Sequence, residues 1–281
     1  MPAPATAPVV SRRRELGDTS ARSLLTTILG EYVLPDDGPV WTATLVTVLA
    51  LCGVEEKSAR QALARTAAEG WLSSERHGRR VCWHLTAPGR RLLVEGAERI
   101  YGFGSAHQEW DRRWLMLMVS VPESKRDLRH RLRTRLSWAG FGTPGPGVWI
   151  SPHVAAEAEA KSILAELGID RQAMSFVATY GALGQVQDMV AAAWQLTEVA
   201  DRYDRFTEQF AELRPGSGDE VLSAQVRLVH EWRRFPFLDP QLPTELLPVK
   251  WSGTNATELF RAKHAEWQPA ARRRWAELAA G

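Results

Sequence analysis

Residues 55–85, EEKSARQALARTAAEGWLSSERHGRRVCWHL, constrain the fold of this chain more than any other stretch. Small and apolar side chains recur in its first half at spacings of three and four residues: Ala59, Ala62, Leu63 and Thr66. This period predicts a helix with one buried face. Gly70 stands where a helix would end, and the run from Trp71 turns at His77-Gly78 and returns to Leu85. The stretch predicts a helix followed by a two-stranded hairpin, in outline a reader of a DNA groove.

The charge of this region is strongly positive. Between residues 57 and 91, eight lysines and arginines stand against two glutamates, a net charge of +6, whereas the whole chain carries +2. Duplex DNA has one negative charge per roughly 1.7 Å of helix axis, and a basic patch binds it largely through release of counterions. The alternative interpretation is a solvated helix and hairpin of an unrelated domain. Periodicity and charge together favour DNA binding.

The candidate DNA-contacting residues differ in chemistry. Arg60, Gln61 and Arg65 are candidates for the major groove, because a guanidinium can bind both guanine acceptors and an amide can bind adenine. Lys57 and Ser58 begin the helix and are expected to hold phosphate together with its free backbone amides. The hairpin adds three candidates for phosphate or the minor groove: Arg76, Arg79 and Arg80. Some of these could instead pair with nearby glutamates, Arg65 first among them, since exposed ion pairs are common and weak.

Helices are expected on both sides of this stretch. Ser20 can cap one over residues 21–33, a second ends before Gly53, and Thr86 can cap a fourth after the hairpin. Helices joined by a turn that contains glycine, followed by a hairpin, predict a winged helix-turn-helix at residues 19–101.

The pattern changes after a linker at residues 101–108. An apolar run typical of a central strand is followed by a basic helix at 125–135, a strand, a helix and another strand. This order predicts a ferredoxin-like α+β domain at residues 109–184. Apolar repeats, the first at 189–210, predict a helical domain at residues 185–281. The Pro- and Ala-rich residues 1–18 predict a disordered arm, and the chain as a whole is expected to be α+β.

The composition excludes several classes of protein. The only two cysteines, Cys52 and Cys82, lie in apolar runs, which indicates neither a disulfide framework nor a zinc site, and a reducing cytoplasm is the expected location. The longest apolar run, residues 41–53, is shorter than the roughly 20 residues that span a bilayer. Glycine-rich segments lack the lysine of a phosphate-binding loop, and no Gly-x-Ser-x-Gly motif occurs. We therefore expect no enzymatic activity, no metal and no resident cofactor.

Three separated groups of motifs resemble one protein family. They are SARSLL at 20–25 with GEYVLP at 30–35 and the hairpin ending EGWLSSERHGRRVCWHLT; WDRRW at 110–114 with PGVWISP at 146–152; and HEWRRFPFLDPQLP at 230–243. From about residue 20 to its end, the chain resembles the PaaX-type transcriptional regulators, repressors of phenylacetate catabolism in bacteria. One departure is Thr66, where the family pattern leads us to expect Leu.

The resemblance implies a homodimeric repressor of an aromatic-acid catabolic operon, bound to a palindromic operator and released by an aryl-CoA thioester such as phenylacetyl-CoA. It also implies that the middle domain is similar to the ferredoxin-like nucleases of CRISPR adaptation. Those nucleases place an Asp at the end of the first strand, where this chain has Ser120 and Val121. We interpret the middle domain as a dimerisation and effector-response unit. The alternatives are a nucleic-acid-processing nuclease and a regulator of the same fold that responds to a different small molecule.

An acyl-CoA effector requires cations for its phosphates and an apolar slot for its acyl group. The chain supplies both types of side chain outside the DNA-binding region: Arg112, Arg113, Trp138, Trp149, Arg233, Arg234 and Trp251. The basic helix at 125–135 is a second source of cations. For any one of these residues, the alternative is a tryptophan of the core or an arginine that caps a helix or bridges domains. Only the seven residues taken together favour an effector pocket.

Overall fold

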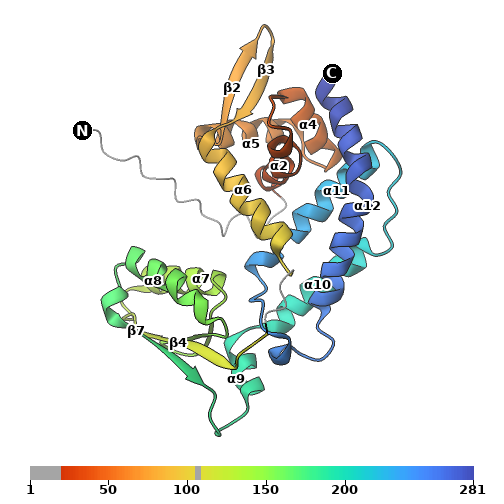
Figure 1. Ribbon diagram of the computed structural model, residues 1–281. Coiled ribbons are helices and arrows are strands. Elements are labelled where there is room, and N and C mark those ends of the chain that lie inside the picture. The colour runs from red at the N-terminus through yellow and green to blue at the C-terminus, as the bar shows by residue number, and fades with distance from the viewer. Residues whose placement is uncertain (1–19, 105–108) are drawn as a thin grey trace, which may run out of the picture. The chain divides into compact units, whose positions relative to one another are not determined.

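The structure is a computed structural model, and it describes residues 20–104 and 109–281. The arm expected at residues 1–18 lies outside the described residues. The chain divides into two compact units, whose elements are labelled in Figure 1. The first contains residues 20–102, 208–234 and 258–281, and the second contains the described residues of 103–207 and 235–257. The helices of the C-terminal domain expected at 185–281 thus contribute to both units, and that domain stays a prediction.

The helices of the first part of the chain occur where the sequence predicts them. They are α2 (Ala21–Ile28), the π-helical turn η1 (Leu29–Val33), α4 (Thr42–Leu51), α5 (Glu56–Ala68) and α6 (Ala87–Gly102). A short helix that was not expected, α3 (Leu34–Asp36), follows η1. The Oγ atom of Ser20 accepts a hydrogen bond from the amide of Ser23 at 3.2 Å, which confirms Ser20 as the N-cap of α2. The hydroxyl of Thr86 likewise accepts from the amide of Gly89 at 3.1 Å at the start of α6.

The predicted hairpin is also present. Its strands are β2 (Leu72–His77) and β3 (Arg80–Leu85), and β1 (Val40–Trp41) completes an antiparallel sheet in the order β1-β3-β2. Leu72 pairs with Leu85 at the base, and His77 pairs with Arg80 next to the turn. Gly78 has a φ of 61° in that turn, a conformation that strains other residues. The hairpin extends away from the helices of this unit (Figure 1).

The core of the first unit is completed by helices from the end of the sequence, α11 (Asp219–Trp232) and α12 (Ser252–Ala280). Leu222 and Val226 of α11, and Ala271 and Trp275 of α12, are buried in one cluster with the apolar residues of α2, α4 and α5. The ring of Trp275 stacks on Tyr32 at a centroid distance of 5.0 Å. The N-terminal helices therefore need the C-terminal ones to bury their apolar faces.

A buried carboxylate, that of Glu31, joins four elements of this unit. Its oxygens lie 3.0 Å from Nε2 of His264 and 3.1 Å from Nε2 of Gln225, and they accept a hydrogen bond from the hydroxyl of Tyr101. The backbone carbonyl of Glu31 accepts from Arg272 at 3.0 Å. Burial raises the pKa of Glu31, but the hydrogen bonds and the charge of His264 outweigh it and hold this pKa below its ordinary value. The ionised form is thus the one that the fold stabilises.

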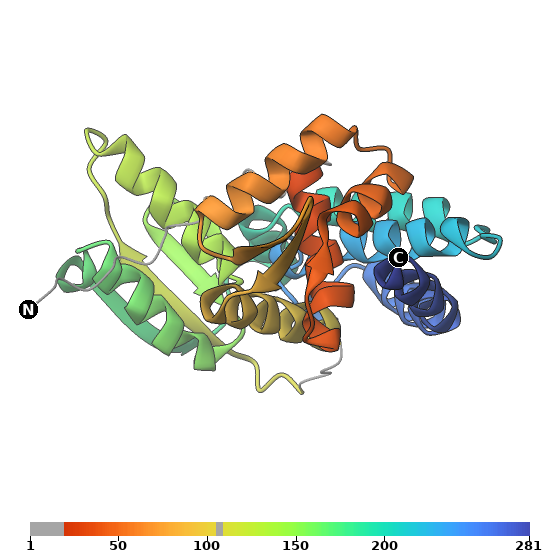
Figure 2. The ribbon, with the colours of Figure 1, turned by 90° about the horizontal axis from the view of Figure 1, so that it is seen from above.

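The second unit contains a four-stranded antiparallel sheet in the order β5-β6-β4-β7. The strands are β4 (Arg113–Val119), β5 (Gly142–Gly145), β6 (Val148–Ser151) and β7 (Ala173–Thr179). One face packs against α7 (Arg126–Trp138) and α8 (Glu157–Glu166), which lie on the same side of the sheet in Figures 1 and 2. The other face packs against α9 (Val186–Ala193) and the residues that follow it. The expected order of strands and helices is confirmed.

Strand β5 was not expected, and the predicted apolar repeat at 189–210 is divided into α9 and α10 (Leu196–Phe210). Trp194, between the two helices, packs so closely on β5 that a Cβ atom at Gly142 would lie 2.5 Å from its ring. The remaining short helices are η2 (Val154–Ala156), η3 (Asp170–Gln172), η4 (Phe235–Phe237) and η5 (Thr244–Leu246). The chain is therefore mixed α+β, as the sequence predicts.

None of the helices in residues 20–104 and 109–281 is both apolar enough and long enough to cross a bilayer.

The buried imidazole of His230 makes the stability of the first unit depend on pH. Its Nδ1 lies 3.1 Å from the hydroxyl of Thr27, and burial, together with the charges of Arg233 and Arg234, lowers the pKa of His230 from 6.5 to about 3. Between pH 6.5 and about pH 3, His230 therefore binds a proton in the unfolded chain but not in the folded chain. We expect the free energy of unfolding to fall by about 2 kcal/mol between pH 7.5 and pH 5 from this group.

The measurement is urea denaturation of the full chain at both pH values. Substitution of His230→Gln should remove that part of the pH dependence, whereas substitution of His130→Gln, an exposed histidine of α7, should leave it unchanged. An equal pH dependence in the His230→Gln variant would contradict this assignment.

Candidate nucleic-acid interface

Helix α5 is held by its small apolar face. Ala59, Ala62, Leu63 and Thr66 are buried, as their spacing predicts, and α5 packs against α2 and α4. The turn between α4 and α5 contains Gly53 with a φ of 88°. Thr66, which departs from the expected Leu, donates its hydroxyl to the carbonyl of Ala62 at 2.8 Å. The substitution therefore leaves no unpaired polar group beneath the helix.

The opposite side of α5 is exposed, and it presents all five of its candidate residues: Lys57, Ser58, Arg60, Gln61 and Arg65. Among the described residues, no ion-pair partner contacts Arg65, although the sequence made it the first candidate for a structural role. Arg60 is the residue that pairs, with its guanidinium 2.7 Å from the carboxylate of Glu56 one turn earlier. Both side chains of that pair are more than half exposed, so the pair is weak and can be exchanged for DNA.

The three arginines of the hairpin are all exposed, but they differ in their contacts. Arg80 lies 4.3 Å over the ring of Trp41 and donates to the carbonyl of Gly281 at 2.8 Å. In the part of the chain that the structure describes, Arg76 and Arg79 have no acidic partner. Arg76 and Arg79 are thus available to a phosphate, whereas Arg80, next to the turn, is already engaged by Trp41 and Gly281.

The positive charge of this region is not neutralised within it. Glu69 binds Arg22 of α2, with one N–O distance of 2.6 Å. Glu75 lies 3.1 Å from His77 and 3.3 Å from His84. The two glutamates within residues 57–91 are therefore engaged by side chains other than the eight cations counted there.

The hairpin is also fixed at its base by a close approach to α6. A Cβ atom at Gly89 would lie 2.3 Å from the carbonyl oxygen of Trp71, the residue that precedes β2. The same carbonyl accepts a hydrogen bond from the amide of Thr86 at 3.0 Å. Glycine at position 89 thus lets α6 pack against the start of the hairpin.

The seven effector candidates are divided between the two units. Arg233 and Arg234 belong to the first unit, and the other five belong to the second. Within the second unit, Trp149 and Trp251 lie in different apolar clusters, which cover opposite faces of the sheet. Trp138 makes an edge contact with Phe237.

Three of the four arginines in this set make contacts within their own unit. Arg113 pairs with Asp111 at 2.7 Å and Arg234 pairs with Glu231 at 3.0 Å, while Arg233 donates to the carbonyl of Ser23 at 3.2 Å. Arg112 is exposed, with a φ of 60°. The structure therefore gives most of these residues a contact within their own unit.

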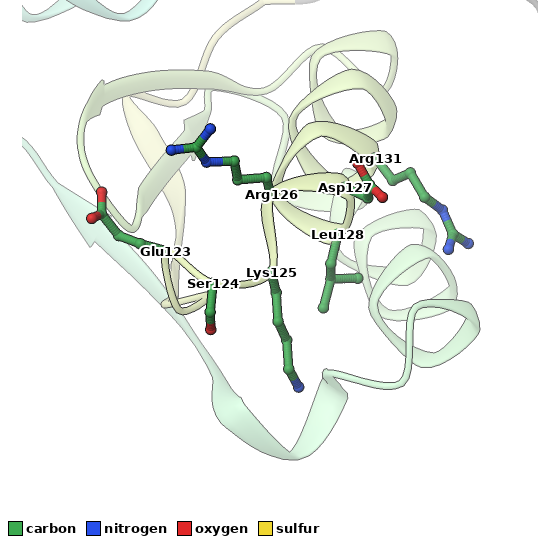
Figure 3. Close-up of a pocket in the computed structure, with 7 residues that line it drawn as sticks. All are labelled: Glu123, Ser124, Lys125, Arg126, Asp127, Leu128 and Arg131. Atoms are coloured by element: carbon green, nitrogen blue, oxygen red, sulfur yellow. The ribbon is translucent and has the colours of Figure 1, made fainter.

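A shallow hollow lies at the start of α7. It is lined by one short segment: Glu123, Ser124, Lys125, Arg126, Asp127, Leu128 and Arg131. Figure 3 shows the side chains of Lys125, Arg126 and Arg131 pointing in different directions. Cations that do not converge offer no cradle for a phosphate group.

Comparisons with known proteins agree with the motif resemblance. Three family models match: PaaX-like protein over residues 20–89, PaaX protein central Cas2-like domain over 107–190, and PaaX-like protein C-terminal domain over 194–277. The chain is 32% identical to Transcriptional repressor PaaX of Escherichia coli (strain K12) over 263 residues, which cover 90% of this chain and 82% of that protein.

Among solved structures, the chain is similar to the Uncharacterized protein Rv0674 from Mycobacterium tuberculosis, with a TM-score of 0.61. The identity is 21%, and the match covers 93% of this chain and 99% of that chain, which shows a shared α+β fold. The three family models and the relative from E. coli each match this chain, and together they cover most of its length. The chain belongs to the PaaX family.

Proposed function

We propose that this protein is a transcriptional repressor that binds operator DNA through a winged helix-turn-helix formed by residues 20–102. The observation that carries the proposal is the exposed basic side of α5 beside a hairpin whose arginines Arg76 and Arg79 have no acidic partner among the described residues. The E. coli relative, similar over most of its length, is itself a transcriptional repressor. In this proposal α5 enters the major groove and the hairpin contacts the flanking backbone.

Two kinds of contact are expected, and they have different consequences. Arg60 and Gln61 would reach base edges and determine sequence preference, whereas Lys57, Ser58 and Arg79 would hold phosphates. A patch of +6 in a chain of +2 attracts DNA only modestly. Tight binding therefore requires two such surfaces held at the spacing of the two halves of an operator.

Substitution of two arginines separates these roles. Arg60→Ala should weaken operator binding by roughly 1 to 3 kcal/mol and relax one base position. Arg79→Ala should weaken binding to all sequences alike and reduce the slope of log K against log salt by about one. Arg205→Ala, an exposed arginine of α10, is the charge-matched control. Fluorescence anisotropy with operator and scrambled DNA measures all three, and unchanged binding in both test variants would refute the interface.

We also propose that the protein forms a homodimer and that the exposed apolar side chains of the four-stranded sheet lie in the dimer interface. Met118, Met174 and Phe176 are 39%, 56% and 45% exposed. The pairing of Met118 with Met174 and of Met116 with Phe176 places them on one face. β7 is also an edge strand of the sheet. Exposed apolar side chains on an edge strand are costly in water, and a second copy of the chain would cover them.

The dimer is tested by substitution of Phe176→Ser with Met174→Ser. Analytical ultracentrifugation should give twice the 31.4 kDa of one chain for the wild type, and a shift toward one chain for the double variant. Val249→Ser, at a side chain 93% exposed outside the sheet, should remain dimeric. A wild type that sediments as one chain at micromolar concentration would contradict the proposal.

The proposed effector is an aryl-CoA thioester of the phenylacetyl-CoA type, which would release the protein from the operator of an aromatic-acid catabolic operon. Family membership supports this proposal. The alternative within the same fold is a regulator of a different small molecule, and the dispersal of the seven candidate residues leaves that alternative open.

A mobility-shift assay on the promoter DNA beside the encoding gene, repeated with a panel of acyl-CoA thioesters, decides between these effectors. Phenylacetyl-CoA should release the DNA at micromolar concentration, and free CoA or phenylacetate should not. If no thioester releases the DNA while binding itself persists, the effector proposal fails and the DNA-binding proposal stands.

The nuclease alternative is not favoured. β4 ends at Val119, and Ser120 follows, where a nuclease of the CRISPR-adaptation type would need an aspartate. The relative named above is a repressor, and the same assay would show metal-dependent shortening of the DNA if the alternative held.

A further inference from the structure

One face of the β2–β3 hairpin gathers four side chains that are common metal ligands. Glu75 and His77 lie two residues apart on β2, and Cys82 and His84 lie two residues apart on β3. Glu75 is directly opposite Cys82 in the antiparallel pairing. Because residues two apart in a strand share a face, all four side chains project from the same side of the hairpin.

The donor atoms of these residues are close together. The donor atoms of Glu75, His77 and Cys82 all lie within 4.8 Å of one another. Nε2 of His77 is 3.1 Å from one oxygen of Glu75, and Nε2 of His84 is 3.3 Å from the other. The Sγ atom of Cys82 is 3.6 Å from Nε2 of His84.

These separations can be compared with a tetrahedral zinc shell. Bonds of about 2.0 to 2.1 Å to nitrogen, about 2.0 to 2.2 Å to oxygen and about 2.3 Å to sulfur place neighbouring N and O ligands roughly 3.4 Å apart, and N and S ligands roughly 3.6 Å apart. The separations of His84 from Glu75 and from Cys82 are close to these values. His77 lies 3.1 Å from the other oxygen of Glu75, and its exposed ring can turn toward the same ion.

We propose that this hairpin binds one Zn²⁺ ion through Cys82 and His84 on β3 and Glu75 and His77 on β2. On binding, the ion displaces the proton of the Cys82 thiol to solvent and takes the thiolate as its ligand, with neutral imidazoles and a carboxylate. The two cysteines of the sequence had indicated no zinc site, because both lie in apolar runs. The strand register supplies the other ligands.

A hydrogen-bonded cluster without metal explains part of this arrangement, since imidazoles and a carboxylate at these distances attract one another. It does not explain Cys82. This thiol is free, is 3% exposed and faces an imidazole, yet a thiol is a weak hydrogen-bond donor and acceptor. As a thiolate it is among the strongest zinc ligands.

The surroundings favour an ordered site with an open entrance. The ring of Trp41 meets that of His77 edge-on at 5.7 Å, which restrains the imidazole. Arg80, the cation on the same face, is held over Trp41 and on the carbonyl of Gly281. Glu75 and His77 are exposed, so an ion can enter from solvent and bind Cys82 beneath them. A bound ion would tie β2 to β3 immediately below the turn.

The test is titration of the metal-free full chain with Co²⁺, which replaces Zn²⁺ and gives visible ligand-field bands and a thiolate charge-transfer band. We expect one equivalent to bind in a tetrahedral site, to show the thiolate band and to be displaced by Zn²⁺. Cys82→Ser should lose the thiolate band. Glu75→Gln and His77→Ala, at exposed positions that the fold tolerates, should weaken the affinity by about 10- to 100-fold or more.

The matched control is Cys52→Ser, the other cysteine. Burial, against a smaller effect of Arg227, raises the pKa of Cys52 to about 11, which disfavours its thiolate, and this variant should bind Co²⁺ like the wild type. Absence of cobalt binding, or equal binding by the Glu75→Gln and His77→Ala variants, would overturn the proposal. Circular dichroism verifies folding, and no DNA is present, so the outcome does not depend on the proposed function.

Discussion

The ionised carboxylate of Glu31, enclosed between four elements, is the interaction on which the first unit depends. It receives Tyr101 from α6, Gln225 from α11 and His264 from α12, and its own backbone lies in the turn that follows α2. A buried charge is expensive unless every partner is present, and loss of one partner costs roughly 3 to 5 kcal/mol. The C-terminal helices are therefore part of the unit that holds α5 and the hairpin.

This arrangement explains how the candidate interface can be both basic and rigid. Buried small residues fix α5 from below, the close contact at Gly89 fixes the base of the hairpin, and glutamates within the region are occupied by Arg22 or by histidines. Cations such as Arg65, Arg76 and Arg79 are consequently presented without an acidic partner among the described residues. A basic surface of this kind binds DNA of any sequence, and the side chains of α5 would add a preference for one base sequence.

The reliability of the sequence patterns differed along the chain for identifiable reasons. The helix of residues 56–68 and the hairpin were predictable because apolar periodicity and turn glycines are local signals. β5 was not, since GTPG has no strand propensity, and its glycine is required by the ring of Trp194 far along the chain. The ion pair with a nearby glutamate is made by Arg60 rather than by Arg65, because the choice of partner depends on rotamers.

By itself, the sequence determined the family, the α+β class, the exposed basic face of α5 and the position of the hairpin, because each follows from residue type and short-range period. Only the tertiary structure decided that α11 and α12 complete the core of the first unit, through contacts more than 190 residues apart such as Gln225 with Glu31. It also decided that Cys82 faces Glu75, His77 and His84. Strand register sets which side chains meet, and register is a property of the folded pair of strands rather than of either segment.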